Sequence, residues 1–261
     1  QFKEDAASAA RSLVQYYFCQ VAALIPSIHS IGPDTDVASA IVEGFLLGSY
    51  SPQAFSTSDT NKVTIEQLLL FSDRQLGQQE KNQLETTIKH VQIVAEATNH
   101  ARDWINTPGN KLTPQIFAQE ARHIAEAHRL DFELIQGQDL LENRLYGLHH
   151  VGKGSENPPL CILLRYRGNP DSSEVLGLVG KGITFDTGGI SLKEADGLEE
   201  LVDDMGGAAA VLAVMKIIGQ MKPKVNVEVV LPCAENMPSG SAYKPGDVIP
   251  TLSGKTIEVI N

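Results

Sequence analysis

The chain has 261 residues, of which 42% are hydrophobic and 20% are charged, and its formal net charge is −11. This composition is that of a globular protein, and the length allows two domains or one large α/β unit. An acidic chain repels the phosphate backbone, so a general nucleic-acid role is disfavoured. No apolar run reaches the roughly 18 residues that span a bilayer, so we expect no membrane partner.

The N-terminal residues QFKEDAASAARS are charged and lack the apolar core of a signal peptide. Because Gln1 is not an initiator Met, we expect that the chain begins inside a longer one. Three scattered cysteines form neither an even disulfide set nor a CxxC metal pair: Cys19, Cys161 and Cys233. They are predicted to be buried thiols in a reducing compartment, which makes a cytoplasmic location the default.

The first part of the chain predicts a small N-terminal α/β domain over residues 1–80, incomplete as given. Residues 34–50 have helical spacing of apolar side chains, and residues 62–71 begin with alternation and are predicted to form a buried strand. Residues 78–105 contain no helix breaker until the segment NTPGNKLTP and predict one long helix. We assign residues 81–105 as a linker helix between two domains.

From residue 106 to residue 261 the pattern is regular α/β, and we expect a second domain. Thr113-Pro114 predicts a helix start, and residues 207–221 predict a helix rich in small residues. The segment LHHVGKG, with His149 and His150, is treated as extended. The predicted strands are 130–135, 160–166, 174–180 (apolar, and therefore buried on both faces), 224–235 and 255–261. Strands alternating with helices indicate a mixed sheet between helices.

The segment VGKGITFDTGGISLK, residues 179–193, places Lys181, Asp186 and Lys193 among glycines at the end of a predicted strand. Ligands collect at the carboxyl ends of strands in open α/β sheets. A phosphate-binding loop would need the pattern GxxxxGK[ST], which the segment lacks. A solvated lysine–aspartate pair on a flexible loop remains the alternative for these residues taken alone.

Asp204 precedes the predicted helix 207–221 and could be only a favoured residue at a helix N-terminus. That account does not explain a second carboxylate and two lysines nearby. Carboxylates suit Zn²⁺, Mn²⁺ or Mg²⁺, and a divalent charge can remove the proton that prevents lysine from acting as a ligand. Metal ligation by the adjacent His149 and His150 is disfavoured. Three other acidic residues are explained without a metal: Asp247 as a turn residue, and Glu199 and Glu200 on a solvent-exposed face.

Four blocks together resemble the leucyl (cytosol) aminopeptidase family of dinuclear metallo-exopeptidases: VGKGITFDTGGISLK, DDMGGAAAVL, NMPSGSAYKPGDVI and SGKTIEVIN. NTPGNKLTP resembles the start of that family's catalytic domain, which implies that residues 106–261 are a catalytic domain that is incomplete at its C-terminal end. The resemblance extends over residues 106–261 and more loosely before them. It implies a hydrolase with two divalent metal ions, peptide substrates, a homo-hexameric assembly and catalytic domains at the centre of that assembly.

By position in these motifs, the resemblance implies that Lys181, Asp186 and Asp204 are metal ligands, with Asp186 bridging two ions. It implies that Lys193 is the catalytic lysine that stabilises the oxyanion. Leu201 falls where the family commonly has a Met lining the pocket for the first side chain of the substrate, which indicates an apolar preference. The family's next motif, Asn-Thr-Asp-Ala-Glu-Gly-Arg, supplies two more metal carboxylates and an arginine, and Asn261 matches its first residue.

We therefore expect a metal-dependent aminopeptidase acting on apolar N-terminal residues, with the 261 residues inactive by themselves. One alternative is a non-catalytic paralogue or fragment that serves as an assembly or interaction protein. The intact Lys181, Asp186, Lys193 and Asp204 argue against it, whereas the two further carboxylates lie outside these residues. A nucleotide- or phosphate-binding protein is the other alternative, and it lacks the lysine-serine/threonine pair.

Overall fold

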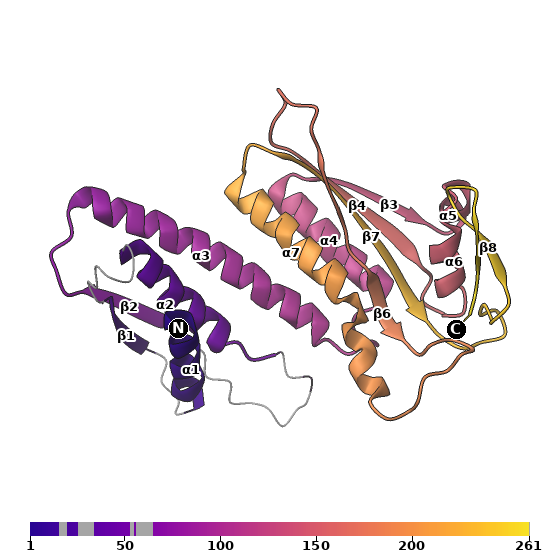
Figure 1. The fold of residues 1–261 in the computed structure, drawn as a ribbon, viewed down its shortest axis with the longest axis horizontal. Coiled ribbons are helices and arrows are strands. Elements are labelled where there is room, and N and C mark those ends of the chain that lie inside the picture. Colours follow the sequence, from indigo (N-terminus) through magenta and orange to yellow (C-terminus); the bar gives the residue numbers. More distant parts are fainter. Residues whose placement is uncertain (16–19, 26–33, 53–54, 56–64, 261) are drawn as a thin grey trace. The chain divides into compact units, whose positions relative to one another are not determined.

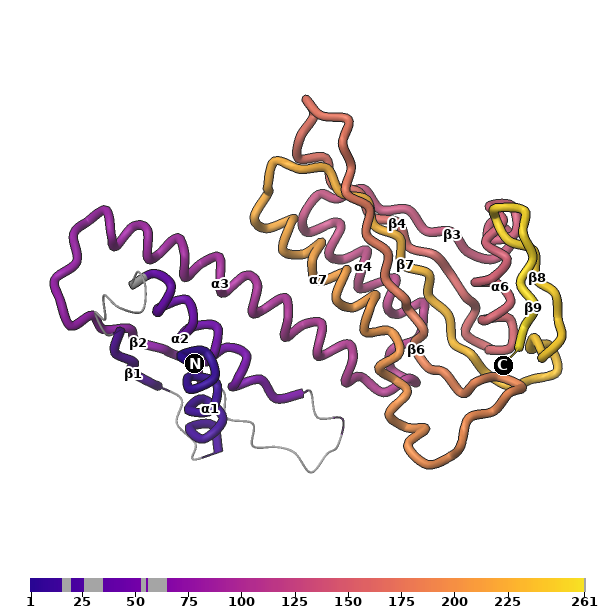
Figure 2. The backbone as a smooth tube through the Cα atoms, viewed as in Figure 1, coloured from indigo at the N-terminus to yellow at the C-terminus, as the bar shows by residue number. Residues whose placement is uncertain are grey.

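The computed structural model describes residues 1–15, 20–25, 34–52, 55 and 65–260 (Figures 1 and 2). The chain divides into two compact units, Gln1–His100 and Ala101–Asn261. Helix α3, Gln78–Ile105, begins in the first unit and ends in the second, and its bounds are those predicted from the sequence. In these described ranges, no helix has both the length and the apolar character needed to cross a membrane.

The described residues of the first unit form a two-stranded parallel sheet, a packed pair of helices and the beginning of the long helix α3. Its elements are α1 (Phe2–Gln15), β1 (Gln20–Ile25), α2 (Asp34–Gly48) and β2 (Gln67–Ser72), followed by the first part of α3. The predicted helix 34–50 is confirmed as α2. Its core joins the two helices to β1 through seven buried side chains: Ala6, Ala10, Ile25, Val37, Ala38, Ile41 and Phe45.

The predicted buried strand over 62–71 is corrected by β2, which begins only at Gln67. Residues 62–64 lie outside the described part. In β2 the side chains alternate, and Leu69 and Phe71 are 45% and 54% exposed. Among the described residues β2 pairs only with β1 and packs one face on the core. The prediction of burial, which was based on the run of apolar residues, was therefore too high for this strand.

The second unit is a mixed sheet with helices α4 and α7 side by side on one face (Figure 1). The strand order is β3-β4-β7-β5, with β6 also paired to β7; β3 and β7 run antiparallel to β4, whereas β5 and β6 run parallel to β7. The elements are α4 (Pro114–His128), β3 (Asp131–Gln136), α5 (Gln138–Glu142), α6 (Tyr146–Gly152), β4 (Leu160–Arg167), β5 (Leu176–Val179), β6 (Gly182–Asp186), η1 (Leu198–Met205), α7 (Gly206–Met221), β7 (Asn226–Asn236), β8 (Val248–Pro250) and β9 (Thr256–Glu258).

Most predicted elements of this unit are confirmed, and the α/β fold class with them. The Thr113 hydroxyl accepts a hydrogen bond from the Ile116 amide at 3.4 Å and caps α4, which has Pro114 at its first position. The core lies between α4, α7 and the sheet. Its largest fully buried side chains in these elements are Phe117, Leu160, Ile162, Leu164, Leu212, Met215, Val227, Val229 and Leu231.

Three expectations for this unit are corrected by the structure. The apolar strand β5 is not buried on both faces, because Leu176 and Val179 are 57% and 73% exposed and β5 ends the strand order among the described residues. His149 and His150 lie in helix α6 rather than in an extended segment. Their rings are 5.5 Å apart in an edge-to-face arrangement, and His150 Nδ1 lies 2.8 Å from the Tyr146 carbonyl one helical turn earlier. The predicted final strand is reduced to the three residues of β9.

Strands β5 and β6 together behave as one strand that is interrupted at Gly180 and Lys181. Both pair with β7, β5 with residues 227–230 and β6 with residues 233–236. At the interruption, the Lys181 carbonyl accepts a hydrogen bond from the Ala208 amide of α7 at 2.8 Å. A Cβ at position 180 would lie 2.7 Å from the Ala208 Cα, so only glycine permits this approach. Lys181 is thus tied to the N-terminal turn of α7.

Candidate metal centre

The turn that follows β6 brings Lys193 back to Asp186. Asp186 is the last residue of β6, and Gly188 and Gly189 follow it with φ angles of +86° and +70°. Residues other than glycine rarely adopt such backbone angles, which explains the two consecutive glycines here. The Lys193 amide then donates to the Thr187 carbonyl at 2.9 Å and closes the turn.

The Asp186 carboxylate receives three hydrogen bonds. Lys193 Nζ lies 2.6 Å from Oδ2, while Oδ1 accepts from the Gly188 amide at 3.0 Å and from Asn236 Nδ2 at 2.7 Å. Burial by itself raises the pKa of Asp186. The three hydrogen bonds and the charge of Lys193 outweigh burial, so the pKa of Asp186 is below its ordinary range. The carboxylate is therefore held ionised and oriented.

A second pair joins Lys181 to Asp204 at 2.8 Å between Nζ and Oδ1. Asp204 belongs to η1, which packs against β6 and ends where α7 begins. Its Oδ2 atom is buried and has no hydrogen-bond partner among the described residues. A buried oxygen without a partner costs free energy, particularly on a carboxylate, so this atom indicates a place for a cation.

The residues present fit part of a divalent metal site. Two carboxylates and two lysines surround β6, and carboxylate oxygens are hard ligands suited to such ions. In the described ranges no cluster of three or more His, Cys, Asp or Glu side chains is placed to hold a metal. No hydrogen bond or ion pair among those residues links the pair Lys181–Asp204 directly to the pair Lys193–Asp186. By themselves these residues would therefore supply only part of the ligands that a divalent metal site needs.

The remaining sequence-predicted residues lie outside these pairs. Leu201 is half-buried in η1, where its backbone leaves helical angles (φ −76°, ψ 15°), and its role in substrate binding stays a prediction. Glu199 and Glu200 are exposed, as expected. Asp247 is the expected turn acid, because it accepts hydrogen bonds from the amide and the ammonium group of Lys244.

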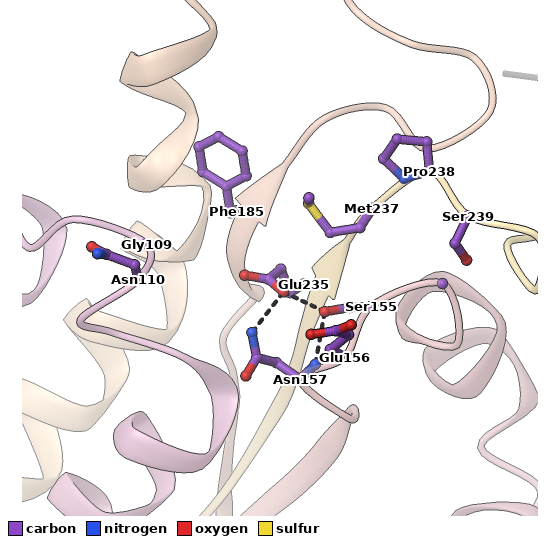
Figure 3. A pocket seen from close by; sticks show the side chains of 11 residues that line it. Gly109, Asn110, Ser155, Glu156, Asn157, Phe185, Glu235, Met237, Pro238 and Ser239 are labelled. Atoms are coloured by element: carbon purple, nitrogen blue, oxygen red, sulfur yellow. Dashed lines mark hydrogen bonds between the residues drawn. The ribbon is translucent and has the colours of Figure 1, made fainter.

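A cavity of about 500 Å³ lies beside the C-terminal ends of β6 and β7 (Figure 3). Glu235 is at its centre, and its Oε2 accepts hydrogen bonds from the Ser155 hydroxyl and from Asn157 Nδ2, the latter at 2.9 Å. The other lining residues come from three loops and β6: Gly109, Asn110, Gly154, Glu156, Phe185, Met237, Pro238 and Ser239. None of the predicted site residues lines this cavity.

Sequence reasoning missed Glu235 and Asn236. They are the last two residues of β7 and pair in parallel with Phe185 and Asp186 at the end of β6. Because successive strand residues face opposite sides, Glu235 faces the cavity while Asn236 reaches Asp186. The available signal was a polar pair at the carboxyl end of a predicted strand, where α/β sheets place their sites.

Comparison with known proteins identifies related sequences. Residues 99–261 match the cytosol aminopeptidase family, catalytic domain. The probable cytosol aminopeptidase of Alkaliphilus oremlandii is 40% identical over 245 residues, which are 92% of this chain and 48% of that protein. The one from Geotalea uraniireducens is 37% identical over 262 residues, covering 100% of this chain and 52% of that protein. The chain thus spans about half the length of the curated relatives it matches.

Solved structures agree with the sequence comparison. The bottromycin maturation enzyme BotP in complex with Mn has a TM-score of 0.84 and 34% identity, over 98% of this chain and 52% of that chain. A mutant of tomato leucine aminopeptidase has a TM-score of 0.85 and 30% identity, over 100% of this chain and 50% of that chain. With a catalytic-domain match over more than half of its residues, the chain belongs to the cytosol aminopeptidase family.

Proposed function

We propose that the full-length protein is a metal-dependent aminopeptidase that removes apolar, leucine-like residues from the N-termini of peptides. The observation that carries the proposal is the pairing of Lys181 with Asp204 and of Lys193 with Asp186 in a chain of this family. Metal dependence is further supported by the solved structure of BotP in complex with Mn.

Lys181, Asp186 and Asp204 would hold two divalent ions, Zn²⁺, Mn²⁺ or Mg²⁺, with Asp186 serving both. When bound, such ions supply Lewis-acid polarisation of the peptide carbonyl and a water activated for attack. Lys181 can donate its lone pair only after Nζ loses its proton, and a neighbouring divalent charge favours that loss. Two further carboxylates, expected from the family motif that begins at Asn261, would complete the ligand set.

Lys193 would act on the reacting peptide itself. Its side chain is 40% exposed, so a substrate can reach it. Its N–H groups would donate to the carbonyl oxygen as negative charge develops there. Lys193 now pairs with Asp186; with a metal held by Asp186, Lys193 would no longer be needed as the counterion of that carboxylate and would be available for this role. Leu201 would offer an apolar contact to the first side chain of the substrate.

The test uses full-length protein stripped of metal with a chelator and then given Mn²⁺ or Zn²⁺. Hydrolysis of leucyl peptides should disappear on stripping and return on addition of metal. Free peptides should be cut, and N-acetylated peptides should not, because acetylation removes the amine that would bind a metal. Equal cleavage of both would refute amine recognition. A folded, metal-replete protein without any hydrolysis would favour the non-catalytic paralogue.

The assembly and compartment are part of the same proposal. The resemblance to the family supports a homo-hexamer, which the mass of the full-length protein in solution would test. A cytoplasmic location is supported by the buried free thiols Cys161 and Cys233. Burial raises the pKa of Cys161 to about 11 and raises the pKa of Cys233 further, so both remain protonated and inert.

A further inference from the structure

We infer that Asn236 is a positioning residue that orients Asp186 toward its cation, an inference that rests on the proposed metal-dependent function. Asn236 ends β7, pairs with Asp186 in parallel register and is only 6% exposed. Its side-chain amide donates from Nδ2 to Asp186 Oδ1 at 2.7 Å. The pairing of β6 with β7 therefore places an amide donor beside the carboxylate that is proposed to bridge two metal ions.

Asn236 makes the two oxygens of Asp186 different from each other. Oδ1 accepts from two neutral donors, Asn236 Nδ2 and the Gly188 amide. Among the residues that the structure describes, Oδ2 accepts only from the cationic Lys193 Nζ. Neutral donors orient a carboxylate without placing a positive charge beside it, so the two bonds to Oδ1 do not repel a metal ion as a cationic donor would. Because Oδ1 is held by these two donors, Oδ2 is the oxygen at which a metal ion would take the place of the Lys193 ammonium group.

The side chain of Asn236 is not needed to form the turn. The Asn236 carbonyl accepts hydrogen bonds from the Thr187 amide at 3.0 Å and from the Thr187 hydroxyl at 2.8 Å. These contacts use the main chain, so any side chain at position 236 retains them. The side chain contributes only the bond to Asp186 among the described residues. The turn and the orientation of the carboxylate are therefore separable by mutation.

Stability alone would not select asparagine at this position. Asn236 Oδ1 is buried and has no hydrogen-bond partner among the described residues. It lies against Gly189, where a Cβ would be only 2.9 Å away. A buried oxygen without a partner destabilises a fold, and an apolar side chain of the same shape would avoid that cost. The geometry therefore points to a role in the site and not in the core.

The experiment replaces Asn236 with leucine, which has a similar branched shape and no polar atoms, in the full-length protein. The dissociation constant for Mn²⁺ is measured by calorimetry, and the melting temperature is measured after metal removal. We expect Mn²⁺ binding to weaken about 10- to 100-fold, the range for partners that orient metal ligands. The melting temperature of the metal-free protein should change little, because loss of the bond to Asp186 is offset by removal of the buried Asn236 Oδ1, which has no partner among the described residues.

The matched control is Asn226→Leu at the other end of β7. Asn226 is also 6% exposed, but its Nδ2 donates to the carbonyls of Asn169, Ser172 and Glu174 at 2.9, 2.9 and 3.2 Å. Asn226→Leu should lower the melting temperature and leave the Mn²⁺ affinity unchanged. Should Asn236→Leu fail to fold, Asn236→Ala, which adds no bulk, provides the same comparison.

An unchanged Mn²⁺ affinity in Asn236→Leu would overturn the inference and leave the proposed function standing. Equal weakening in Asn226→Leu would also overturn it, because the effect would then be a general loosening of β7. A wild-type protein that binds no Mn²⁺ or Zn²⁺ would instead refute the proposed function, and the positioning role with it.

Discussion

Lys193 and Asp186 form an ion pair of 2.6 Å between Nζ and Oδ2 across a turn that contains two glycines of positive φ. In this arrangement the lysine neutralises the carboxylate when no other cation is near. A metal ion at Asp186 would replace the lysine in that role and free its ammonium group. If the proposed metal site is correct, this one short turn would couple the binding of a metal to the release of the proposed oxyanion donor.

Asp186→Ala in the full-length protein should lose both metal ions, because a bridging carboxylate serves two ions at once. Metal content measured after dialysis should fall to the level of a chelator-treated sample. The matched control is Asp196→Ala, an exposed acid in the segment between Lys193 and η1, which should keep its metal. Full metal occupancy in Asp186→Ala would show that this residue is not a bridging ligand.

Lys193→Ala should keep its metal and lose rate. Removal of one donor to a developing oxyanion typically costs on the order of 10²–10³ in kcat. Turnover of a leucyl substrate and metal content should be measured on the same preparation. Lys224→Ala provides the control, because the Lys224 side chain is 71% exposed and its nearest carboxylate is that of Asp171 at 3.4 Å. Wild-type turnover in Lys193→Ala would remove the lysine from the mechanism.

A polypeptide consisting of residues 1–261 alone should bind divalent metal weakly and show no measurable peptidase activity. Lys181, Asp186 and Asp204 supply one amine and two carboxylates, too few to compensate two ions of about +4 total charge. Several apolar side chains are also exposed, among them Val179 and Ile260 at 73% and 85%, and should promote aggregation. Robust Mn²⁺-dependent turnover of a leucyl substrate would show that the ligand assignment is wrong.

Gly219→Ala should destabilise the second unit. Gly219 of α7 lies against His128 of α4, and an added Cβ would be 2.4 Å from the His128 Cβ. Such overpacking typically costs about 1–3 kcal/mol of unfolding free energy. The matched control is Gly147→Ala in α6, where no heavy atom lies within 4 Å of the added Cβ. That change should stabilise by about 0.4–1 kcal/mol, because alanine restricts the unfolded chain. Chemical denaturation measures both variants.

The stability of the second unit should fall in mild acid through His128. Burial first, and then the charges of Lys216 and Lys222, lower the pKa of His128 below its ordinary value of 6.5. The unfolded chain therefore takes up a proton at a higher pH than the folded chain does. The contribution of His128 to the free energy of unfolding is fully present above about pH 6.5 and is lost as the pH falls through the lowered pKa of the folded state.

His128→Gln should flatten this dependence when the unfolding free energy is compared at pH 7 and pH 5. The control is His123→Gln on the same helix, whose side chain is 69% exposed and which should change the dependence little. An unchanged slope in His128→Gln would assign the effect to other groups.

Part of this fold could be predicted from the sequence because local signals were strong. Helix α3 was predicted to the residue, since 28 residues without a breaker are followed by Pro108 and Gly109. Strands β4 and β7 were found within two residues at each end, because apolar and β-branched residues fill them. Exposure was predicted poorly for β5 and β2, because composition does not show which neighbours cover a strand.

The candidate site, like the fold, could be predicted only in part. Lys181, Asp186, Lys193 and Asp204 could be singled out because charged residues among glycines at a strand end are unusual. The partners within this set were not predictable, and the structure pairs Lys181 with Asp204 and Lys193 with Asp186. Asn236 could not be found, because its importance comes from the register between β6 and β7, which no local pattern encodes.

The hydrogen bond at the interruption between β5 and β6 makes local opening of the site measurable by hydrogen exchange. The Ala208 amide donates to the Lys181 carbonyl, so its proton can exchange with solvent only when α7 and the interrupted strand separate. Deuterium uptake at this single amide would measure the local opening of the proposed metal-binding edge in any variant. A substitution that leaves the melting temperature unchanged but speeds this exchange would have loosened Lys181 without unfolding the sheet around it.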